Sequence, residues 1–352
     1  VRVGRFGRQT GLRSKREWIL LRGSPGHMPA AQTDIVAKPP RTTLPTVTFN
    51  LDGAPLCLDN VHDMSLPLLD PIDVWEATDV VCPSLSVNPV FQTSQGVLYE
   101  GDCLDILPHI ADESIDTVFA DPPFNLAKKY GKKVNDDRPN GEYVLWCKRW
   151  LDECVRVIKP GGAVFIYNLP KWNVLIGAHL AEEGLDFRHW ITINIKLSLP
   201  IPGRLYPSHY SLLYYTKGKP KTFNKIRTPI ETCRHCGGEI KDYGGHRGAM
   251  NPNGVNLTDV WNDITPVRHW KFTSRKRSAN QLSTKILERV VNLSTHEGEV
   301  VLDPFGGSGT TFDVCERLCR HWIGIEMESC DVIIERLQNG DLHPHDTGDF
   351  VE

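Results

Sequence analysis

The stretch Ser114-Ile-Asp-Thr-Val-Phe-Ala-Asp-Pro-Pro-Phe124 decides how the chain is organised. It becomes fully apolar at 118–120 and then breaks at Pro122 and Pro123, which predicts a buried strand that ends in a rigid turn. Proline has a fixed φ and no N–H, and the residue before a proline is restricted to extended geometry. We therefore expect Asp121 and the Pro122 carbonyl to be held firmly at the carboxyl end of this strand, where open α/β sheets place their ligand crevice.

The residues Asp121, Pro122, Pro123 and Phe124 together have the chemistry of a receptor for a flat group that carries an NH2. The carboxylate of Asp121 and the carbonyl of Pro122 are acceptors for the two N–H bonds, and the Phe124 ring offers a stacking surface. The structural alternative is a strand followed by a Pro-Pro turn and a helix N-cap. Because a four-residue motif does not decide between these interpretations, the rest of the chain must.

Strand-like and helix-like segments alternate around this motif between residues 96 and 216. Two neighbouring strands close the block, so we predict a parallel sheet with an antiparallel edge. The predicted strands are Gly96–Asp102, Ala163–Tyr167, His189–Ile195 and Ser211–Thr216, and the predicted helices are Cys103–Ile110, Tyr143–Ile158 and Trp172–Glu183. The run Lys159-Pro-Gly-Gly162 is the stop signal of the second helix.

The same alternation returns after residue 281 around a glycine-rich turn, Pro304-Phe-Gly-Gly-Ser-Gly-Thr-Thr311. The predicted elements are a helix at Ser283–Leu293, a strand at Val300–Asp303, a helix to about Leu318 and a strand at His321–Ile325 that ends in Glu326. Glycines let the backbone approach a ligand, and an acid at the next strand end can hold ribose hydroxyls, which is typical of a nucleoside-cofactor site. The turn matches neither Gly-x-Gly-x-x-Gly nor a P-loop, and it has no phosphate-binding lysine. This favours a cofactor whose adenosine is not phosphorylated.

Residues 217–280 break the pattern and are rich in Lys, Arg, Gly, Pro and Asn. The run Arg268–Arg277 interleaves cations with aromatic rings, which suits phosphate contact and base stacking, although a solvated basic loop is the alternative. The cations that we single out for nucleic-acid contact are Arg204, Lys271, Arg275, Lys276 and Arg277. The polar residues 125–140 predict a mobile loop over the site.

The overall composition is that of a soluble globular protein, with 40% hydrophobic and 24% charged residues among 352. The net charge of −3 means that any nucleic-acid surface must be a local patch. No apolar run approaches the roughly 20 residues that span a bilayer, so we expect no membrane contact. The ten cysteines and the lack of a signal-peptide pattern predict reduced thiols and a cytoplasmic location.

Residues 1–95 are predicted to be a mostly loop-rich or disordered extension, with a short strand at Thr46–Leu51. Seven Arg and Lys residues precede Met28, against a single acid, Glu17. We interpret residues 1–27 as not native, with Met28 as the natural start. A basic arm that binds nucleic acid is the alternative.

The two motif blocks, in this order, resemble the S-adenosylmethionine-dependent DNA amino-methyltransferases of the permuted β class. In that class an Asp-Pro-Pro-aromatic motif precedes the target-recognition region, and a Phe-x-Gly-x-Gly motif comes last. This sequence has Asp121-Pro-Pro-Phe124, then the irregular residues 217–280, then Phe305-Gly-Gly-Ser-Gly309. The resemblance covers about residues 96–338, and the supporting similarities are Gly101-Asp102-Cys103, Val157–Gly162, Tyr214–Gly218, Asn280-Gln-Leu282 and Trp322–Glu326.

The resemblance implies a Rossmann-like, seven-stranded mixed α/β sheet flanked by helices, with an irregular target-recognition insert. It divides the chain into a catalytic half at 96–216, the insert at 217–280, a cofactor half at 281–340 and a tail at 341–352. It implies that Asp121 and the Pro122 carbonyl bind the target amine within a motif completed by Pro123, and that Phe124 stacks on the base. The implied residues around S-adenosylmethionine are Asp102, Asp303, Phe305, Gly306, Gly307, Gly309 and Glu326, with Glu326 on the ribose and Asp303 below the methionine amino group.

The resemblance also implies a substrate, which is a flipped-out base of double-stranded DNA. Asp at the first motif position is commoner among members that act on adenine N6 than on cytosine N4, so Asp121 favours adenine N6. The alternatives are cytosine N4, an RNA substrate and a catalytically silent DNA-binding relative. Family partners to expect are a second copy of the chain and a companion restriction endonuclease.

The pair in Cys233-Arg-His-Cys236 resembles half of a zinc ribbon. A second Cys pair is absent, and His246 is the one further ligand that we identify. We therefore favour a reduced turn over a zinc site.

Overall fold

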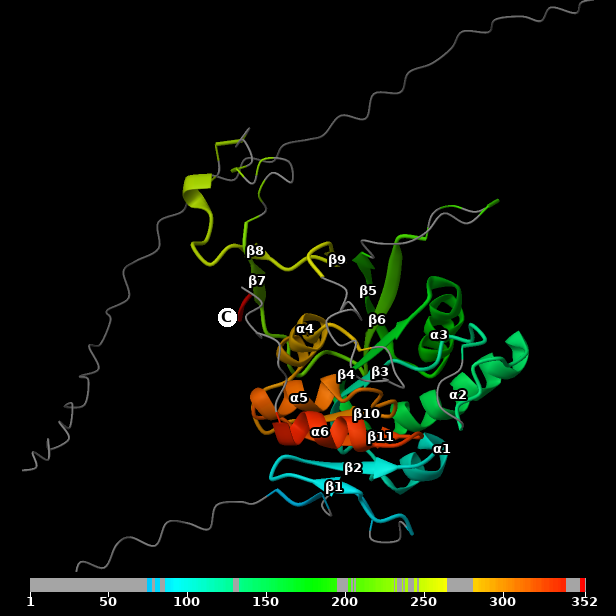
Figure 1. The fold of residues 1–352 in the computed structure, drawn as a ribbon. Helices are drawn as coiled ribbons and strands as arrows, with labels where there is room; N and C mark the ends of the chain where they lie inside the picture. Colours follow the sequence, from blue (N-terminus) through cyan, green and yellow to red (C-terminus); the bar gives the residue numbers. More distant parts are fainter. Residues whose placement is uncertain are drawn as a thin grey trace, which may run out of the picture. The chain divides into compact units, whose positions relative to one another are not determined.

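The computed structural model describes residues 75–77, 80–82, 86–128, 133–194, 202–203, 205, 207–230, 232, 236, 238–239, 244–245, 247–264, 281–339 and 349–351 (Figure 1). All of them belong to one compact unit, Leu69–Glu352, and the other unit is Val1–Leu68. The strand expected at Thr46–Leu51 and most of the expected extension therefore lie outside the described residues.

A nine-stranded sheet forms the centre of the described unit, in the order β1-β2-β11-β10-β3-β4-β6-β5-β9. Its seven longer strands are β2 (Gly96–Glu100), β3 (Ile115–Ala120), β4 (Ile158–Asn168), β5 (Asp186–Asn194), β6 (His209–Thr216), β10 (Val300–Asp303) and β11 (His321–Glu326). Two strands of two residues each, β1 (Phe91–Gln92) and β9 (Val260–Trp261), extend its two edges. The expected mixed α/β sheet is thus confirmed, with a short strand added at either edge.

Strands β2, β11, β10, β3 and β4 run parallel, and β6 and β5 continue the sheet in antiparallel pairing. Strands β10 and β11 come late in the sequence, yet they lie between β2 and β3. The register pairs Leu302 with Val118 and Glu326 with Glu100. The carboxyl ends of these five strands therefore meet at one edge of the sheet.

The described helices cover both faces of the sheet (Figure 1). One face carries α1 (Cys103–Ile106), α2 (Asn140–Val157) and α3 (Pro170–Glu182), and the other carries α4 (Thr284–Ser294), α5 (Thr310–Arg317) and α6 (Asp331–Asn339). Successive residues of β3 divide between the two cores, because Val118 and Ala120 belong to the first and Phe119 to the second. Residues 118–120 are all apolar because β3 is buried on both sides.

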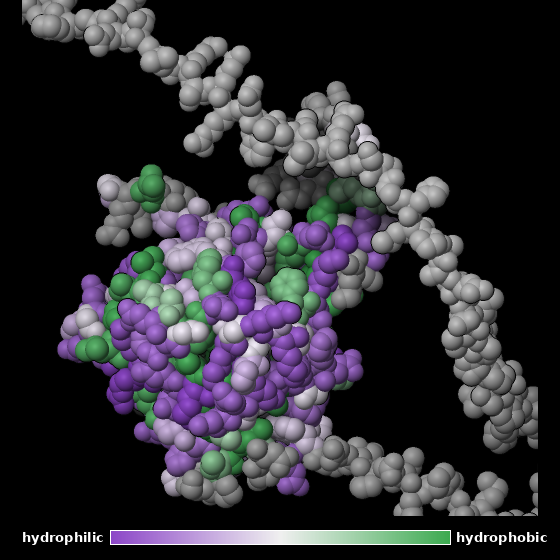
Figure 2. All heavy atoms as spheres, turned by 180° about the vertical axis from the view of Figure 1, so that it is seen from behind, coloured by the Kyte–Doolittle hydropathy of each residue, from purple (hydrophilic) through white to green (hydrophobic). Residues whose placement is uncertain are grey.

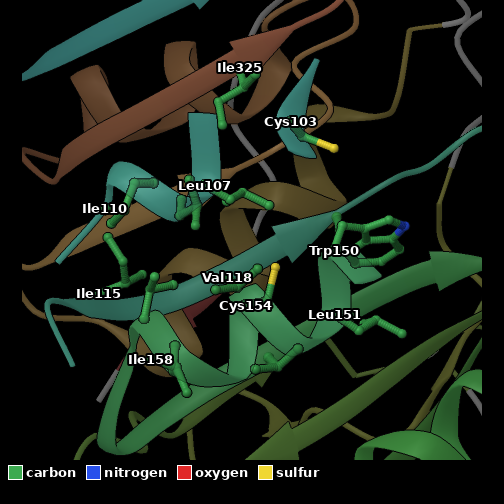
Figure 3. Close-up of a cluster of buried hydrophobic side chains, with 14 of the residues drawn as sticks. Cys103, Leu107, Ile110, Ile115, Val118, Trp150, Leu151, Cys154, Ile158 and Ile325 are labelled. Atoms are coloured by element: carbon green, nitrogen blue, oxygen red, sulfur yellow. The ribbon is translucent and has the colours of Figure 1, made fainter. Parts of the chain in front are cut away.

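Figure 3 shows the first core, where Trp150 and Cys154 of α2 lie near Val118 of β3. Leu107 and Ile325 close the same cluster, and all five side chains are fully buried. The described surface seen from behind is mostly hydrophilic, with small hydrophobic patches (Figure 2). None of the described helices has both the length and the apolar composition that crossing a membrane requires.

Two predicted helix ends differ from the structure. The helix expected over Cys103–Ile110 is α1 followed by the 3-10 helix η2 (Leu107–His109), because Pro108 has no N–H for the α-helical ladder. The stop signal Lys159–Gly162 lies inside β4 rather than before it. The β3–β4 pairing shifts register between Ile115 and Thr117, so this run enters the sheet as a bulge.

A second, three-stranded sheet has the order β12-β7-β8. It consists of β7 (Ile226–Thr228), β8 (Val255–Asn256) and β12 (Phe350–Val351), and the short 3-10 helix η3 (Arg247–Ala249) lies between β7 and β8 in the sequence. Arg289 of α4 ties this region together. Its guanidinium is 1% exposed and bonds Asp349 (Nε to Oδ2, 2.7 Å) and Asp263 (Nη2 to Oδ2, 2.6 Å).

Candidate active site

A pocket opens at the carboxyl edge of the sheet, and neighbouring strands supply acids to it. Asp102 follows β2, Glu326 ends β11 and Asp121 follows β3. Of the residues predicted for the site, Asp102, Asp121, Pro122, Pro123, Phe124, Phe305, Gly307 and Glu326 line this pocket. The structure therefore brings together the two motifs that the sequence holds far apart.

The backbone of the Asp-Pro-Pro-Phe motif is fixed by two buried side chains. Tyr143 donates its hydroxyl to the Pro123 carbonyl (2.6 Å), and Trp172 donates its indole N–H to the Phe124 carbonyl (2.8 Å). Among the described residues, no donor bonds the Pro122 carbonyl or the Asp121 carboxylate, although both residues line the pocket. Two successive lining residues thus carry acceptors whose hydrogen-bonding capacity is unused by the described chain.

Burial raises the pKa of Asp121 well above its usual range, and the nearby Asp303 carboxylate raises it further, while Lys128 opposes both effects. A carboxylate with a raised pKa binds a proton or a cationic donor more readily than an exposed one. The Asp121 carboxylate therefore has a higher proton affinity than an exposed one.

An aromatic cluster surrounds Phe124. The ring centroids of Tyr167 and Tyr210 lie 6.0 and 5.6 Å from that of Phe124, and 5.2 Å from each other. Neither tyrosine belongs to a motif that predicts the site. Tyr167 lies near the end of β4, beside β3, so the strand-end rule could have found it, whereas Tyr210 depends on the antiparallel pairing of β6 with β4.

Glu326 holds the glycine-rich turn against the end of β11. Its carboxylate accepts hydrogen bonds from the backbone N–H groups of Gly307 (2.7 Å) and Glu328 (2.8 Å). Burial raises its pKa, which these hydrogen bonds partly offset. Asp102 lines the pocket and also caps α1 by accepting from the Leu104 N–H (3.0 Å).

Asp303, Gly306 and Gly309 lie behind the pocket lining. Asp303 is 2% exposed and accepts from the Phe305 N–H (2.9 Å) and the Thr311 hydroxyl (2.5 Å). A Cβ at Gly309 would come within 2.9 Å of Ile333, and its φ of +76° also favours glycine. This glycine lets α5 start close to α6 and thereby shapes the turn that Gly307 presents to the pocket.

The described residues of the loop after the motif are held by hydrogen bonds, and the mobility expected over 125–140 stays a prediction. The Asp136 carboxylate is 3% exposed and accepts the backbone N–H groups of Asn125 (2.6 Å), Leu126 (3.1 Å) and Lys128 (2.9 Å). Asn125 and Ala127 have positive φ values of 55° and 54°. A single buried carboxylate therefore stabilises a conformation that these residues rarely adopt.

The same loop delivers Arg138 to the pocket. Asn125 accepts from the Arg138 N–H (2.7 Å) and donates to its carbonyl (2.8 Å), and the guanidinium lies 5.2 Å from the Trp146 ring centroid. Trp146 also lines the pocket and packs against Phe305 at 5.8 Å. Neither Arg138 nor Trp146 is predicted from the sequence, because neither belongs to a motif.

The remaining predicted site residues are Arg204, Lys271, Arg275, Lys276, Arg277, Cys233 and the third candidate ligand His246, and all of them lie outside the described residues. Cys236 is described, and it is exposed. The predicted DNA contacts and the predicted half zinc ribbon therefore stay predictions.

Comparison with known proteins connects this geometry to DNA methylases. A family model for N6/N4 DNA methylases matches residues 115–335. The chain is 56% identical over 256 residues to the type II methyltransferase M.BamHI of Bacillus amyloliquefaciens, which covers 72% of this chain and 60% of that protein. It is 34% identical over 245 residues to the type II methyltransferase M.HpaI of Haemophilus parainfluenzae, which covers 68% of this chain and 73% of that protein.

A solved structure has the same fold. The PvuII DNA methyltransferase, described as cytosine-N4-specific, superposes with a TM-score of 0.52 at 21% identity. The match covers 73% of this chain and 97% of that one. At this identity the similarity is one of fold.

Proposed function

The chain belongs to the N6/N4 family of DNA methylases, and on this premise we propose that it transfers the methyl group of S-adenosylmethionine to an exocyclic amine of a base in double-stranded DNA. One observation carries the proposal. The Asp121 carboxylate and the Pro122 carbonyl both line the pocket and have no described hydrogen-bond donor, next to the Phe124 ring. Two acceptors beside an aromatic face match an NH2 group on a planar ring.

The chemistry follows from the weakness of the nucleophile. The lone pair of such an amine is delocalised into the ring, and two accepted N–H bonds localise it on nitrogen. S-adenosylmethionine supplies an electrophilic methyl group: the N–C bond forms as the S–C bond breaks. The amine then gives its surplus proton to Asp121, whose raised pKa suits that role. Fixing the motif through Tyr143 and Trp172 keeps both acceptors in place, and such positioning supplies much of the rate.

The pocket fits the charge of the cofactor. Its lining contains Asp102, Glu326 and Glu328, and Asp303 lies beneath it, which suits a ligand with a sulfonium, an ammonium and ribose hydroxyls. We assign Glu326 to the ribose and Asp303 to the methionine amino group. Gly307 and Phe305 would form the part of the pocket wall next to the methionine amino group.

Adenine N6 is the proposed target atom, because Asp121 opens the catalytic motif. Cytosine N4 is the second candidate, because the PvuII enzyme that shares the fold is described as cytosine-N4-specific. Both amines sit beside a ring nitrogen and present the same two N–H bonds. The base must leave the duplex to reach the pocket, at a cost of a few kcal/mol. The insert 217–280 and the cations Arg204, Lys271, Arg275, Lys276 and Arg277 are the proposed contacts to the distorted DNA, and a companion endonuclease and a homodimer stay predictions.

Methyl transfer from labelled S-adenosylmethionine to unmethylated duplex DNA, followed by nucleoside analysis, tests this function. N6-methyladenine would support the proposed base, and N4-methylcytosine would replace it while keeping the mechanism. We expect Asp121→Ala to lower the rate by at least about 100-fold, as the loss of one transition-state hydrogen bond does in other enzymes.

Asp105→Ala is the matched control, since Asp105 is an exposed carboxylate on α1 outside the pocket lining. It should leave the transfer rate unchanged. Transfer to RNA alone, or cofactor binding without any transfer, would contradict the proposal.

A further inference from the structure

The acidic pocket contains one feature that the proposed function does not use. Arg138 is the one lysine or arginine among the described residues that line the pocket, where four carboxylates also lie, at Asp102, Asp121, Glu326 and Glu328. Arg138 forms no ion pair with any carboxylate that the structure describes. A cation held at the wall of an acidic pocket therefore has its charge available for a ligand.

The location of Arg138 identifies the end of the pocket that it serves. Its guanidinium lies over the Trp146 ring at 5.2 Å, and Trp146 contacts Phe305. The Phe305 N–H in turn donates to Asp303 (2.9 Å), the carboxylate assigned to the methionine amino group. Arg138 thus belongs to the end that would receive the amino-acid part of the cofactor.

We infer that Arg138 binds the carboxylate of the methionine portion of S-adenosylmethionine, an inference that rests on the proposed function. The cofactor has two cationic groups and one anionic group. The acids of the pocket match the cations, and Arg138 is the described lining residue that matches the anion. Guanidinium and carboxylate groups form paired hydrogen bonds, and stacking on Trp146 restricts the guanidinium beforehand.

The loop geometry couples this contact to the catalytic motif. Asn125 follows Phe124 directly, and its side chain holds Arg138 through the backbone N–H and carbonyl alone. A substitution of the Arg138 side chain therefore leaves these two bonds in place. Cofactor binding would fix the loop position that also fixes Asp121 and Pro122.

Calorimetry in the absence of DNA tests the inference by measuring how the wild-type protein and Arg138→Gln each bind two ligands. The ligands are S-adenosylmethionine and its decarboxylated form, which lacks only the carboxylate. We expect Arg138→Gln to weaken S-adenosylmethionine binding by about 10- to 100-fold, because a hydrogen bond between charged groups is lost. The decarboxylated ligand should bind both proteins equally, and Arg138→Lys should recover part of the affinity.

Arg149→Gln is the matched control, because Arg149 is an exposed arginine of α2 outside the pocket lining. It should bind both ligands as the wild type does. Equal losses for both ligands in Arg138→Gln would assign Arg138 to packing against Trp146, and no loss for either would assign it to another ligand such as a DNA phosphate; both results overturn the inference. If the wild-type protein bound neither ligand, the proposed function itself would fail.

Discussion

At the scale of single residues, Asp303 is a carboxylate in surroundings that oppose its charge. Burial raises its pKa to about 7, although hydrogen bonds from Thr311 and from the Phe305 N–H oppose the shift. A cationic ligand nearby stabilises the ionised form, so cofactor binding should displace a proton below about pH 7. We expect the affinity for S-adenosylmethionine to rise about tenfold from about pH 6 to about pH 8 and to level off above.

Calorimetry in buffers of different ionisation enthalpy measures that proton directly. In Asp303→Asn the affinity should be lower and nearly independent of pH over the same range, while the exposed Asp105→Asn should follow the wild type. An affinity that falls as the pH rises through 7 would exclude the assigned role of Asp303.

Asp136 is a second buried carboxylate, and its role is to hold the catalytic loop. It accepts the backbone N–H groups of Asn125, Leu126 and Lys128, within a segment where Asn125 and Ala127 have positive φ values. Asp136→Ala leaves these donors without their acceptor, which should lower the free energy of unfolding by about 2–4 kcal/mol. Because the loop also positions Asp121, the variant should lose more in kcat than in cofactor affinity.

Urea denaturation and steady-state kinetics check both parts of this prediction. The neighbouring Asp137 is exposed, and no hydrogen bond is described for its carboxylate, so Asp137→Ala is the control. Equal behaviour of the two variants would show that the loop does not depend on Asp136.

The residues of the two motifs could be predicted because a local run of sequence encodes each of them. Asp121–Phe124 combines a strand end with two prolines, and these signals need no distant partner. The role of Asp136 could not be predicted, since an exposed loop acid and a buried one look the same in sequence. Tyr210 reaches Phe124 only because β6 pairs with β4, although α3 and β5 separate these strands in sequence.

At the scale of elements, the helix α4 connects the insert to the last described residues of the chain. Arg289 stacks on Trp261 of β9 at 5.1 Å and bonds Asp263 and Asp349, the latter with 7% side-chain exposure. Arg289→Met removes a buried cation beside the buried Asp349 carboxylate and the half-exposed Asp263 carboxylate. We expect the free energy of unfolding to fall by about 3–5 kcal/mol.

Lys148→Met provides the contrast, because the Lys148–Glu182 pair joins α2 and α3 at 3.7 Å on the surface. Its loss should cost less than about 1 kcal/mol. Chemical denaturation of both variants measures the two losses in the free energy of unfolding. Similar losses would mean that Arg289 stabilises the fold no more than an exposed ion pair does.

Element boundaries show what local patterns miss. The run Lys159–Gly162 has the composition of a helix stop, and α2 does end just before it, at Val157. The same residues are also part of β4. Gly162 lies so close to the adjacent strand that a Cβ there would lie 2.9 Å from the Asp116 carbonyl. Close approach to a neighbouring strand is a tertiary constraint, and no window of sequence contains it.

At the scale of the whole molecule, the order of strands explains why both motifs reach one pocket. Parallel strands share their carboxyl edge, so Asp121, Asp102 and Glu326 converge although the insert separates them in sequence. The expected sheet could be predicted from the alternation of elements and from the family resemblance. The second sheet could not, because its strands of two or three residues have no periodicity and β12 pairs with a strand far upstream.

The interleaving of β10 and β11 between β2 and β3 also governs how a newly made chain can fold. While a ribosome is still translating the insert, β2 and β3 are already synthesised, yet each lacks its neighbour on one side. Their apolar edges stay open until Glu326 has left the exit tunnel, which is the condition under which nascent chains engage chaperones or aggregate. Conversely, a fragment that ends before β10 should keep the edges of β2 and β3 open to β11 and β10. The two halves, made as separate polypeptides, therefore have a structural basis for reassembling into one sheet.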